Sequence, residues 1–370
     1  QIQVVRRFVQ EQHVGFLEHD AAEQQARRLA ARERLSRLEA FLPAEQHLAK
    51  QTAKFTSVMA RFVRLKALTE SGNRGPWSNA AEIDLLVGSR RVHQWADGRE
   101  IHFAMRLSRP CAAVRFFAND REVAGAAQIE GASLKCALMF PDAAAAPLLV
   151  KLALSGVDIA GAMRNLDAEL PHWDFDRVHG DARSAWAREL ASMQVEGGSE
   201  GELRTFYTAA YHARLAPTLF SDMDGRYRGM DTAVHQLPAN AQNYSTYSLW
   251  DTYRALHPLF NLVAPERSAD LVRGLVRMTL ESPDGPPVWP LQGIETHCMI
   301  GWHSLVVIAE AATKNVPGID YAAIWPRLRT LAFDDPTSGL EPYRRLGYIP
   351  SDEVAEAASK TLEYAYDDWA

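Results

Sequence analysis

Two kinds of hydrophobic pattern divide the chain. Between residues 62 and 155, short runs alternate apolar and polar positions with period two, as in a strand with one buried face. Turns bearing Gly, Asp or Pro separate these runs, which is typical of an antiparallel sandwich. The predicted strands cover residues 62–68, 81–86, 100–107, 112–117 and 148–155.

After about residue 160 the apolar residues recur at helical spacing, as Trp186, Leu190 and Met193 do. Loops rich in Gly, Pro and aromatic residues join these segments. Helices of this length with such loops indicate an α-helical toroid, in which the loops at one end form a pocket. The predicted helices cover residues 182–193, 203–215, 248–262, 268–280, 304–313, 321–331 and 353–369.

The first 55 residues differ from both regions. Arg, Glu, Gln, Ala and Leu dominate there, and Leu35, Leu38 and Leu42 lie at i, i+3 and i+7. This pattern predicts one or two amphipathic helices. Because the heptad pattern does not extend beyond two repeats, we expect a covering helix or a loosely held arm, and not a coiled coil.

Composition excludes several classes of protein. Apolar residues make up 47% and charged residues 23% of the 370 positions, which fits a globular protein and excludes a disordered or collagen-like chain. The sequence contains no apolar run of about 18 residues, so we expect no membrane span. A net charge of −6, from 40 basic and 46 acidic residues mixed along the chain, argues against a nucleic-acid partner. The three separated cysteines exclude a disulfide scaffold.

Candidate chemistry concentrates first in residues 243–258. There Trp250 stands beside Asp251, which is a suitable pair for a sugar. The C–H face of a sugar stacks on an aromatic ring, and its hydroxyls donate to a carboxylate. A helix cap or an ion pair with Arg254 would explain Asp251 equally well, and spacing alone leaves these interpretations open.

A second cluster spans residues 293–304. Glu295 is a candidate carboxylic acid or a hydroxyl-binding group. His297, Cys298 and His303 match no zinc spacing and lack a fourth ligand. Cys298 also has no evident activating neighbour that would make it a nucleophile.

Two further segments carry charge in a pattern. Glu363 and Asp367 share one helical face with Lys360 and Tyr364, which indicates either a salt-bridged helix or a polar stripe facing a pocket. The acidic run 222–231 lacks the closing Glu of a calcium-binding EF-hand loop, so we expect a tight, arginine-rich turn there.

At these clusters the sequence resembles glycoside hydrolase family 92, the calcium-dependent exo-acting α-mannosidases. The similar sequence motifs occur in the same order over about residues 150–370. A weaker resemblance, to the end of a discoidin-type (factor 5/8 type C) module, covers residues 60–83. The words of the family are Asn165-Leu-Asp-Ala-Glu169, Trp173-Asp-Phe-Asp176, Phe206-Tyr-Thr-Ala-Ala-Tyr-His212, Phe220-Ser-Asp-Met-Asp-Gly-Arg-Tyr-Arg-Gly-Met-Asp231, Tyr244-Ser-Thr-Tyr-Ser-Leu-Trp-Asp-Thr252, Val288-Trp-Pro290, Glu295-Thr296, Gly347-Tyr-Ile-Pro350 and the segment 359–369.

The resemblance implies an N-terminal β-sandwich, a C-terminal (α/α)6 toroid and calcium at their junction. It also implies inversion, in which one carboxylic acid protonates the leaving oxygen and a second carboxylate activates water. The order of the family's motifs places the acid, the base and the calcium-binding carboxylate beyond Ala370. We therefore expect no metal ligands in this chain and no turnover from it alone, with Glu295 as the fallback acid and Glu363 or Asp367 as base.

These implications define four expected parts of an α+β multi-domain protein. They are a helical segment (1–55), the end of a discoidin-like β module (56–90), a β-sandwich portion (91–160) and part of an (α/α)6 glycosidase domain (161–370). The residues expected to bind substrate are Trp250, Asp251, Glu295 and His303.

The expected function follows from the same resemblance. It is exo-acting α-mannosidase activity on mannose-containing glycans, with calcium as cofactor, in a secreted or periplasmic enzyme. The first thirty residues show no signal-peptide pattern, so the location rests on the resemblance. One alternative is a non-catalytic carbohydrate-binding protein that uses the pocket of Asp251. The other is a different helical-toroid hydrolase or lyase with Glu295 as its acid.

Overall fold

The computed structural model describes residues 60–68, 83–93, 95–140, 147–335 and 337–370. The predicted helical segment 1–55 lies outside the described residues. The chain divides into two compact units. The first contains the described residues up to 91 together with 101–154 and 158–215, and the second contains 92–100, 155–157 and 216–370.

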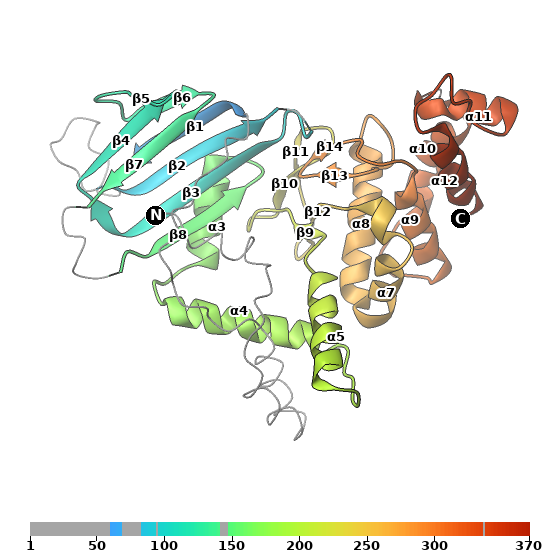
Figure 1. Ribbon diagram of the computed structural model, residues 1–370, viewed down its shortest axis with the longest axis horizontal. Coiled ribbons are helices and arrows are strands. Elements are labelled where there is room, and N and C mark those ends of the chain that lie inside the picture. Colours follow the sequence, from blue (N-terminus) through green and yellow to red (C-terminus); the bar gives the residue numbers. More distant parts are fainter. Residues whose placement is uncertain (1–59, 69–82, 94, 141–146, 336) are drawn as a thin grey trace. The chain divides into compact units, whose positions relative to one another are not determined.

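Strands dominate the first unit. They form a five-stranded sheet in the order β6-β1-β2-β3-β8 and a three-stranded sheet in the order β5-β4-β7 (Figure 1). The strands are β1 (Ala60–Leu68), β2 (Ile83–Val92), β3 (Glu100–Cys111), β4 (Ala113–Ala118), β5 (Arg121–Glu122), β6 (Gln128–Gly131), β7 (Leu134–Met139) and β8 (Val150–Ser155). All five strands expected from alternation are present, and β5, β6 and β7 are additional.

The two sheets share an apolar core. Leu86 on β2, Met105 on β3, Phe116 on β4 and Ile129 on β6 are all buried in one cluster. β1 pairs antiparallel with β6, and β4 pairs antiparallel with β7. β1 and β2 lie in one sheet with β3, β6 and β8.

Three helices complete the first unit: α3 (Ile159–Glu169), α4 (Phe175–Leu190) and α5 (Glu200–His212). α3 begins where the Asp158 side chain accepts a hydrogen bond from the backbone N–H of Gly161, which satisfies a free donor of the first turn. Its buried Ala162 and Leu166 lie in one cluster with residues of β2 and β3. Residues 158–215 thus lie in the first compact unit together with the strands.

Helices dominate the second unit. They are α6 (Leu249–Thr252), α7 (Leu256–Val263), α8 (Pro265–Glu281), α9 (His303–Thr313), α10 (Tyr321–Asp334), η1 (Thr337–Gly339), α11 (Leu340–Leu346) and α12 (Ala357–Trp369). Short two-stranded pairs lie between them, namely β9 (Thr218–Leu219) with β12 (Tyr244–Ser245), β10 (Arg226–Arg228) with β11 (Val234–Gln236), and β13 (Pro290–Leu291) with β14 (Ile294–Glu295).

α8 is the central helix of this unit. Proline at its first position suits a helix start, because the missing N–H would have had no partner there. Leu271, Val272 and Leu275 on α8 are almost fully buried, and helices α7, α9 and α10 pack around it (Figure 1). The expectation of a mixed α+β chain, with sheets first and helices afterwards, is confirmed.

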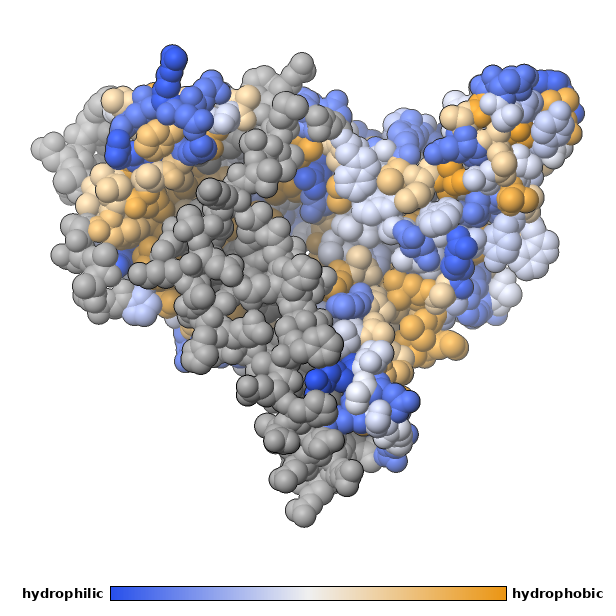
Figure 2. Space-filling view, viewed as in Figure 1, coloured by the Kyte–Doolittle hydropathy of each residue, from blue (hydrophilic) through white to orange (hydrophobic). Residues whose placement is uncertain are grey.

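The surface of the helical unit mixes polar and apolar residues, as Figure 2 shows. Trp325 on α10 is 64% exposed, and Trp369 on α12 is 79% exposed. Among the described residues, no helix combines the length and the apolar character needed to cross a lipid bilayer.

Candidate sugar-binding site

Asp251 lies in the first turn of α6 with its side chain exposed. The Ser248 hydroxyl donates a hydrogen bond to its carboxylate. Arg254, considered above as an ion-pair partner, instead donates to the backbone carbonyl of Trp250 at 3.1 Å. The Asp251 carboxylate is therefore held in place by a hydroxyl and remains open to solvent on α6.

Trp250 is held on two sides. Its indole N–H donates to Oε1 of Glu363 at 3.1 Å, and the Arg254 guanidinium lies 5.1 Å from its ring centroid. A cation over one face of an indole is favourable, but it occupies a face that a sugar would otherwise use. The Trp250 ring is thus fixed in position, and one of its faces is already covered by a guanidinium.

A chain of ionisable side chains continues from Trp250 through Glu363. Nδ1 of His303 lies 2.7 Å from Oδ1 of Asp367, and Nε2 lies 3.3 Å from Oε2 of Glu363. The His303 and Asp367 side chains are each 1% exposed. The backbone N–H of Trp302 donates to the other Asp367 oxygen at 2.6 Å. His303, expected as a substrate-binding residue, therefore lies between two carboxylates and away from solvent.

Tyr253 completes this chain. Its ring stacks on the His303 imidazole with centroids 4.0 Å apart and an interplanar angle of 12°. Its hydroxyl donates to Oε2 of Glu363 at 3.4 Å. Burial, and then the nearby Glu363 carboxylate, raise the pKa of Tyr253 above its ordinary value, so the phenol stays protonated and donates.

Of the four residues on the predicted stripe of α12, Glu363 and Asp367 both reach His303. Tyr364 instead packs on Trp302, with ring centroids 5.1 Å apart. Nζ of Lys360 lies 3.9 Å from Oε2 of Glu356, so Lys360 pairs with a residue one turn earlier on the helix and not with the site. Half of the stripe therefore serves the site, and the other half serves packing and the surface.

Glu295 holds a loop together. Its Oε1 accepts from the backbone N–H groups of Trp289 at 3.0 Å and His297 at 2.8 Å, and its Oε2 accepts from that of Val288 at 2.8 Å. Three backbone N–H groups therefore fix this carboxylate within the loop. The geometry favours a positioning role.

Asp251 and Glu295 belong to one continuous arrangement. The Trp289 indole N–H donates to the Ser248 hydroxyl at 2.9 Å, and Ser248 donates to Asp251. The Trp289 backbone N–H in turn donates to Glu295. The structure thus places both carboxylates of the sequence analysis at the same part of the second unit, joined through Ser248 and Trp289.

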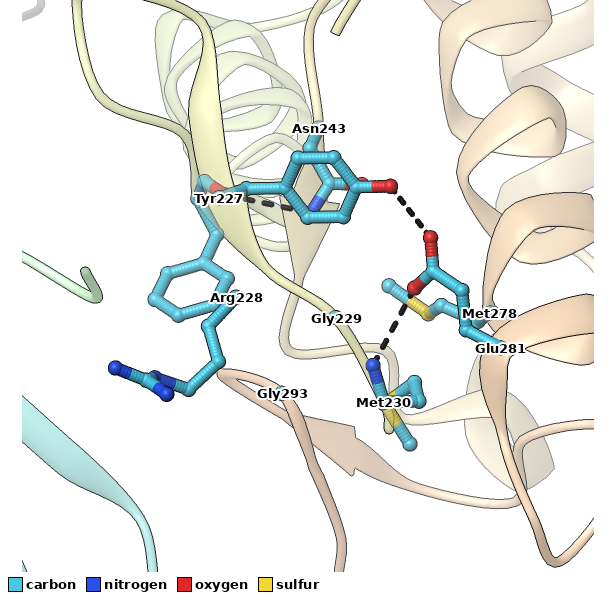
Figure 3. Close-up of a pocket in the computed structure, with 9 residues that line it drawn as sticks. Tyr227, Arg228, Gly229, Met230, Asn243, Met278, Glu281 and Gly293 are labelled. Carbon is cyan, nitrogen blue, oxygen red and sulfur yellow. Dashed lines mark hydrogen bonds between the residues drawn. The ribbon is translucent and has the colours of Figure 1, made fainter. Parts of the chain in front are cut away.

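A second polar cluster lines a small cavity beneath the β10–β11 hairpin (Figure 3). Glu281, at the end of α8, accepts from the Tyr227 hydroxyl and from the Met230 backbone N–H at 3.3 Å. Burial, and then the bond to Glu281, raise the pKa of Tyr227 far above its ordinary value. This cluster fastens the hairpin to α8.

The acidic run 222–231 forms the expected tight turn, and each of its carboxylates has a protein partner. Asp222 accepts from Ser155 at 2.7 Å, Asp224 pairs with Arg226 at 2.9 Å, and Asp231 lies 3.0 Å from His235. Within the described ranges, no three His, Cys, Asp or Glu side chains group so that they could hold a metal ion.

Sequence reasoning missed Ser248, Trp289 and Tyr253 as parts of this site. Trp289 carried a signal, because it lies in the rigid Val288-Trp-Pro290 word. Ser248 and Tyr253 carried none beyond their place beside Trp250 and Asp251, because a hydroxyl has no characteristic spacing.

Comparison with known proteins identifies the family of the chain. The family model described as "Glycosyl hydrolase family 92 catalytic domain" matches residues 161–370. The chain belongs to glycosyl hydrolase family 92. This match assigns the chain to a class of enzyme, the glycoside hydrolases, which the α+β fold and the Trp–Asp site alone did not do.

Solved structures agree with this assignment. The family 92 α-mannosidase BT3965 from Bacteroides thetaiotaomicron is 33% identical with a TM-score of 0.75, and the match covers 84% of this chain and 41% of that one. The inverting mannosidase BT2199 from the same organism is 27% identical with a TM-score of 0.73, covering 84% and 42%. A curated relative, an uncharacterized secreted glycosidase from Arthroderma benhamiae, is 24% identical, covering 59% of this chain and 26% of the relative. The chain thus spans less than half the length of these relatives.

Proposed function

We propose that this chain forms the part of an exo-acting, inverting α-mannosidase that holds the terminal mannose of mannose-containing glycans. The observation that carries the proposal is the exposed Asp251 carboxylate, fixed by Ser248 and Trp289 in a chain of family 92. BT3965, a solved relative, is described as an α-mannosidase and has been solved in complex with mannoimidazole. Two adjacent sugar hydroxyls would donate to Asp251.

Hydrolysis with inversion needs a proton donor and a carboxylate that activates water. The three other carboxylates around the site are already occupied. Glu295 accepts three backbone N–H groups, Glu363 accepts from Trp250 and Tyr253, and Asp367 accepts from Trp302. We therefore propose that these three position the site and that the acid and base come from outside the described residues.

The proposed architecture follows the family as well. The two sheets would be a portion of a β-sandwich, and α6–α12 would be a portion of an (α/α)6 toroid. Calcium remains a proposal without assigned ligands, because the described residues do not group into a metal site, and no step is assigned to it. Because the relative from Arthroderma benhamiae is described as a secreted glycosidase, we propose a secreted or periplasmic location.

The test uses the enzyme expressed from its whole coding sequence. Proton NMR during hydrolysis of α-linked mannobiose should show the β-anomer of mannose first, before mutarotation, as inversion requires. The matched α-linked glucose disaccharide should release no sugar. Appearance of the α-anomer first would contradict inversion. Binding of mannobiose without release would support the alternative, a non-catalytic carbohydrate-binding protein.

A further inference from the structure

α6, the turn of helix that carries Asp251, cannot hold its own position. It contains only the four residues Leu249–Thr252, and no side-chain hydrogen bond caps its start. A single helical turn fixes several backbone dihedrals for one hydrogen bond, so it depends on tertiary contacts. Leu249 is fully buried and anchors the inner side of this turn. The outer side, where Asp251 is exposed, needs a separate support.

Glu363 on α12 supplies this support on both sides of Asp251. The indole N–H of Trp250, one residue before Asp251, donates to Oε1 of Glu363 at 3.1 Å. The hydroxyl of Tyr253, two residues after Asp251, donates to Oε2 of Glu363 at 3.4 Å. One carboxylate from a helix far later in the sequence therefore brackets the turn that carries Asp251.

Glu363 is itself restrained by a buried histidine. Nε2 of His303 lies 3.3 Å from Oε2 of Glu363, and Nδ1 of His303 lies 2.7 Å from Oδ1 of Asp367. Gly301, with φ of 82°, lies against the same imidazole, because a Cβ atom there would be 2.5 Å from Nε2 of His303. The imidazole is thus held between two carboxylates and a backbone turn, and it restrains the Glu363 carboxylate in turn.

The Glu363 carboxylate has little capacity left for a sugar. Its side chain is 19% exposed, and its two oxygens already face two hydrogen-bond donors and the imidazole. Asp251, by contrast, is exposed to solvent. The geometry therefore separates a carboxylate that can meet the sugar from one that determines where the first carboxylate lies.

We infer that Glu363 is a positioning residue, which acts on the sugar only through Asp251 by bracketing its turn. The inference rests on the proposed function and adds to it the route by which α12 acts on the mannose subsite. A misplacement of about 1 Å in a substrate-binding group can cost about a hundredfold in rate. Loss of the bracket should therefore appear in kcat/KM, although Glu363 does not touch the substrate.

The experiment is a double-mutant cycle on the enzyme expressed from its whole coding sequence, with kcat and KM measured for an aryl α-mannoside. Glu363→Ala should lower kcat/KM about 10–100-fold, because both hydrogen bonds to the turn are lost. In the Asp251→Ala background the same change should lower kcat/KM by less than about twofold, since no carboxylate is left to position. A merely structural role of Glu363 would lower kcat/KM equally in both backgrounds.

Two milder variants keep the test independent of folding. Glu363→Gln keeps an acceptor oxygen for the Trp250 indole and should retain at least about a third of kcat/KM. Tyr253→Phe removes one side of the bracket but keeps the ring that stacks on His303, so it should lower kcat/KM about threefold. The matched control, Glu353→Ala, removes an exposed carboxylate before α12 and should leave kcat/KM within about twofold.

Three results would overturn the inference. Equal losses from Glu363→Ala with and without Asp251 would show that Glu363 acts independently of the turn. A loss of several orders of magnitude in Glu363→Gln, with an unchanged unfolding midpoint in urea, would make Glu363 a catalytic group. Unchanged kcat/KM in Glu363→Ala would show that the turn needs no bracket. If the unaltered enzyme releases no mannose, or Asp251→Ala leaves kcat/KM unchanged, the proposed function itself fails and the bracket fails with it.

Discussion

The buried Asp367 carboxylate provides the sharpest test of how the site is held. Replacing Asp367 by alanine removes the acceptor of two donors, the backbone N–H of Trp302 at 2.6 Å and the ring nitrogen of His303 at 2.7 Å. The side chains of Asp367 and His303 are both 1% exposed, so water has no access to replace the lost acceptor.

The magnitude follows from burial. A buried donor left without an acceptor costs about 1–3 kcal/mol, and Asp367→Ala leaves two such donors. We therefore expect Asp367→Ala to lower the free energy of unfolding by about 2–6 kcal/mol. Asp367→Asn keeps one acceptor oxygen and the shape of the side chain, so it should lose about 1–3 kcal/mol.

The assay is urea unfolding at equilibrium, followed by tryptophan fluorescence, because Trp302 donates its backbone N–H to the altered group. Asp352→Ala, at an exposed position, removes the same charge and should stay within about 0.5 kcal/mol of the unaltered chain. If Asp367→Ala and Asp352→Ala lost the same small amount, the His303–Asp367 pair would not hold the site and the reasoning would be refuted.

Three further outcomes follow from the same contacts. Glu295→Ala should lower the free energy of unfolding by about 1–3 kcal/mol in urea, since three backbone N–H groups lose their acceptor, and a change below about 0.5 kcal/mol would count against the positioning role. Burial lowers the pKa of His257 to about 4, so the unfolded chain binds more protons between about pH 6.5 and 4. Stability should therefore fall as the pH drops through this window, by about 3 kcal/mol from this residue, and His257→Phe should remove that part of the pH dependence. The 370-residue chain alone, assayed with an aryl α-mannoside and added calcium, should show no turnover, and chelator-sensitive mannose release would instead place a catalytic pair within it.

Helical periodicity in the sequence predicted the two most buried helices of the second unit. The expected segment 268–280 corresponds to α8, and 304–313 corresponds to α9, because both carry apolar residues over a wide face. The expected helix 248–262 is split into α6 and α7 instead. Pro258 explains the split, because it has no N–H to donate to the carbonyl of Arg254 and its ring would clash with that carbonyl.

The candidate site was predictable only where its residues are neighbours in sequence. Trp250 and Asp251 stand side by side, so their pairing is visible in the chain. The indole of Trp250 donates to a residue 113 positions away, and that of Trp289 donates to one 41 positions away. Such contacts depend on how α12 and the β13–β14 loop pack, which no local pattern of the sequence specifies.

The resemblance to family 92 and the residue patterns agreed for Asp251, whereas the structure favours another role for Glu295. The resemblance implied that Asp251 binds sugar hydroxyls, and the structure adds the contacts through which Ser248 and Trp289 fix this carboxylate. Glu295 attracted attention as a possible acid, whereas its three backbone donors favour a loop-holding role. A carboxylate's type and spacing do not reveal which donors it meets.

The central claim, that Asp251 holds the terminal mannose, is tested most directly by kcat/KM. In the enzyme expressed from its whole coding sequence, Asp251→Asn should lower kcat/KM for an aryl α-mannoside at least about tenfold, since a charge-assisted hydrogen bond contributes about 1.5–3 kcal/mol. Its unfolding midpoint in urea should stay unchanged, because the carboxylate is exposed on α6. Unchanged kcat/KM with unchanged stability would contradict the account.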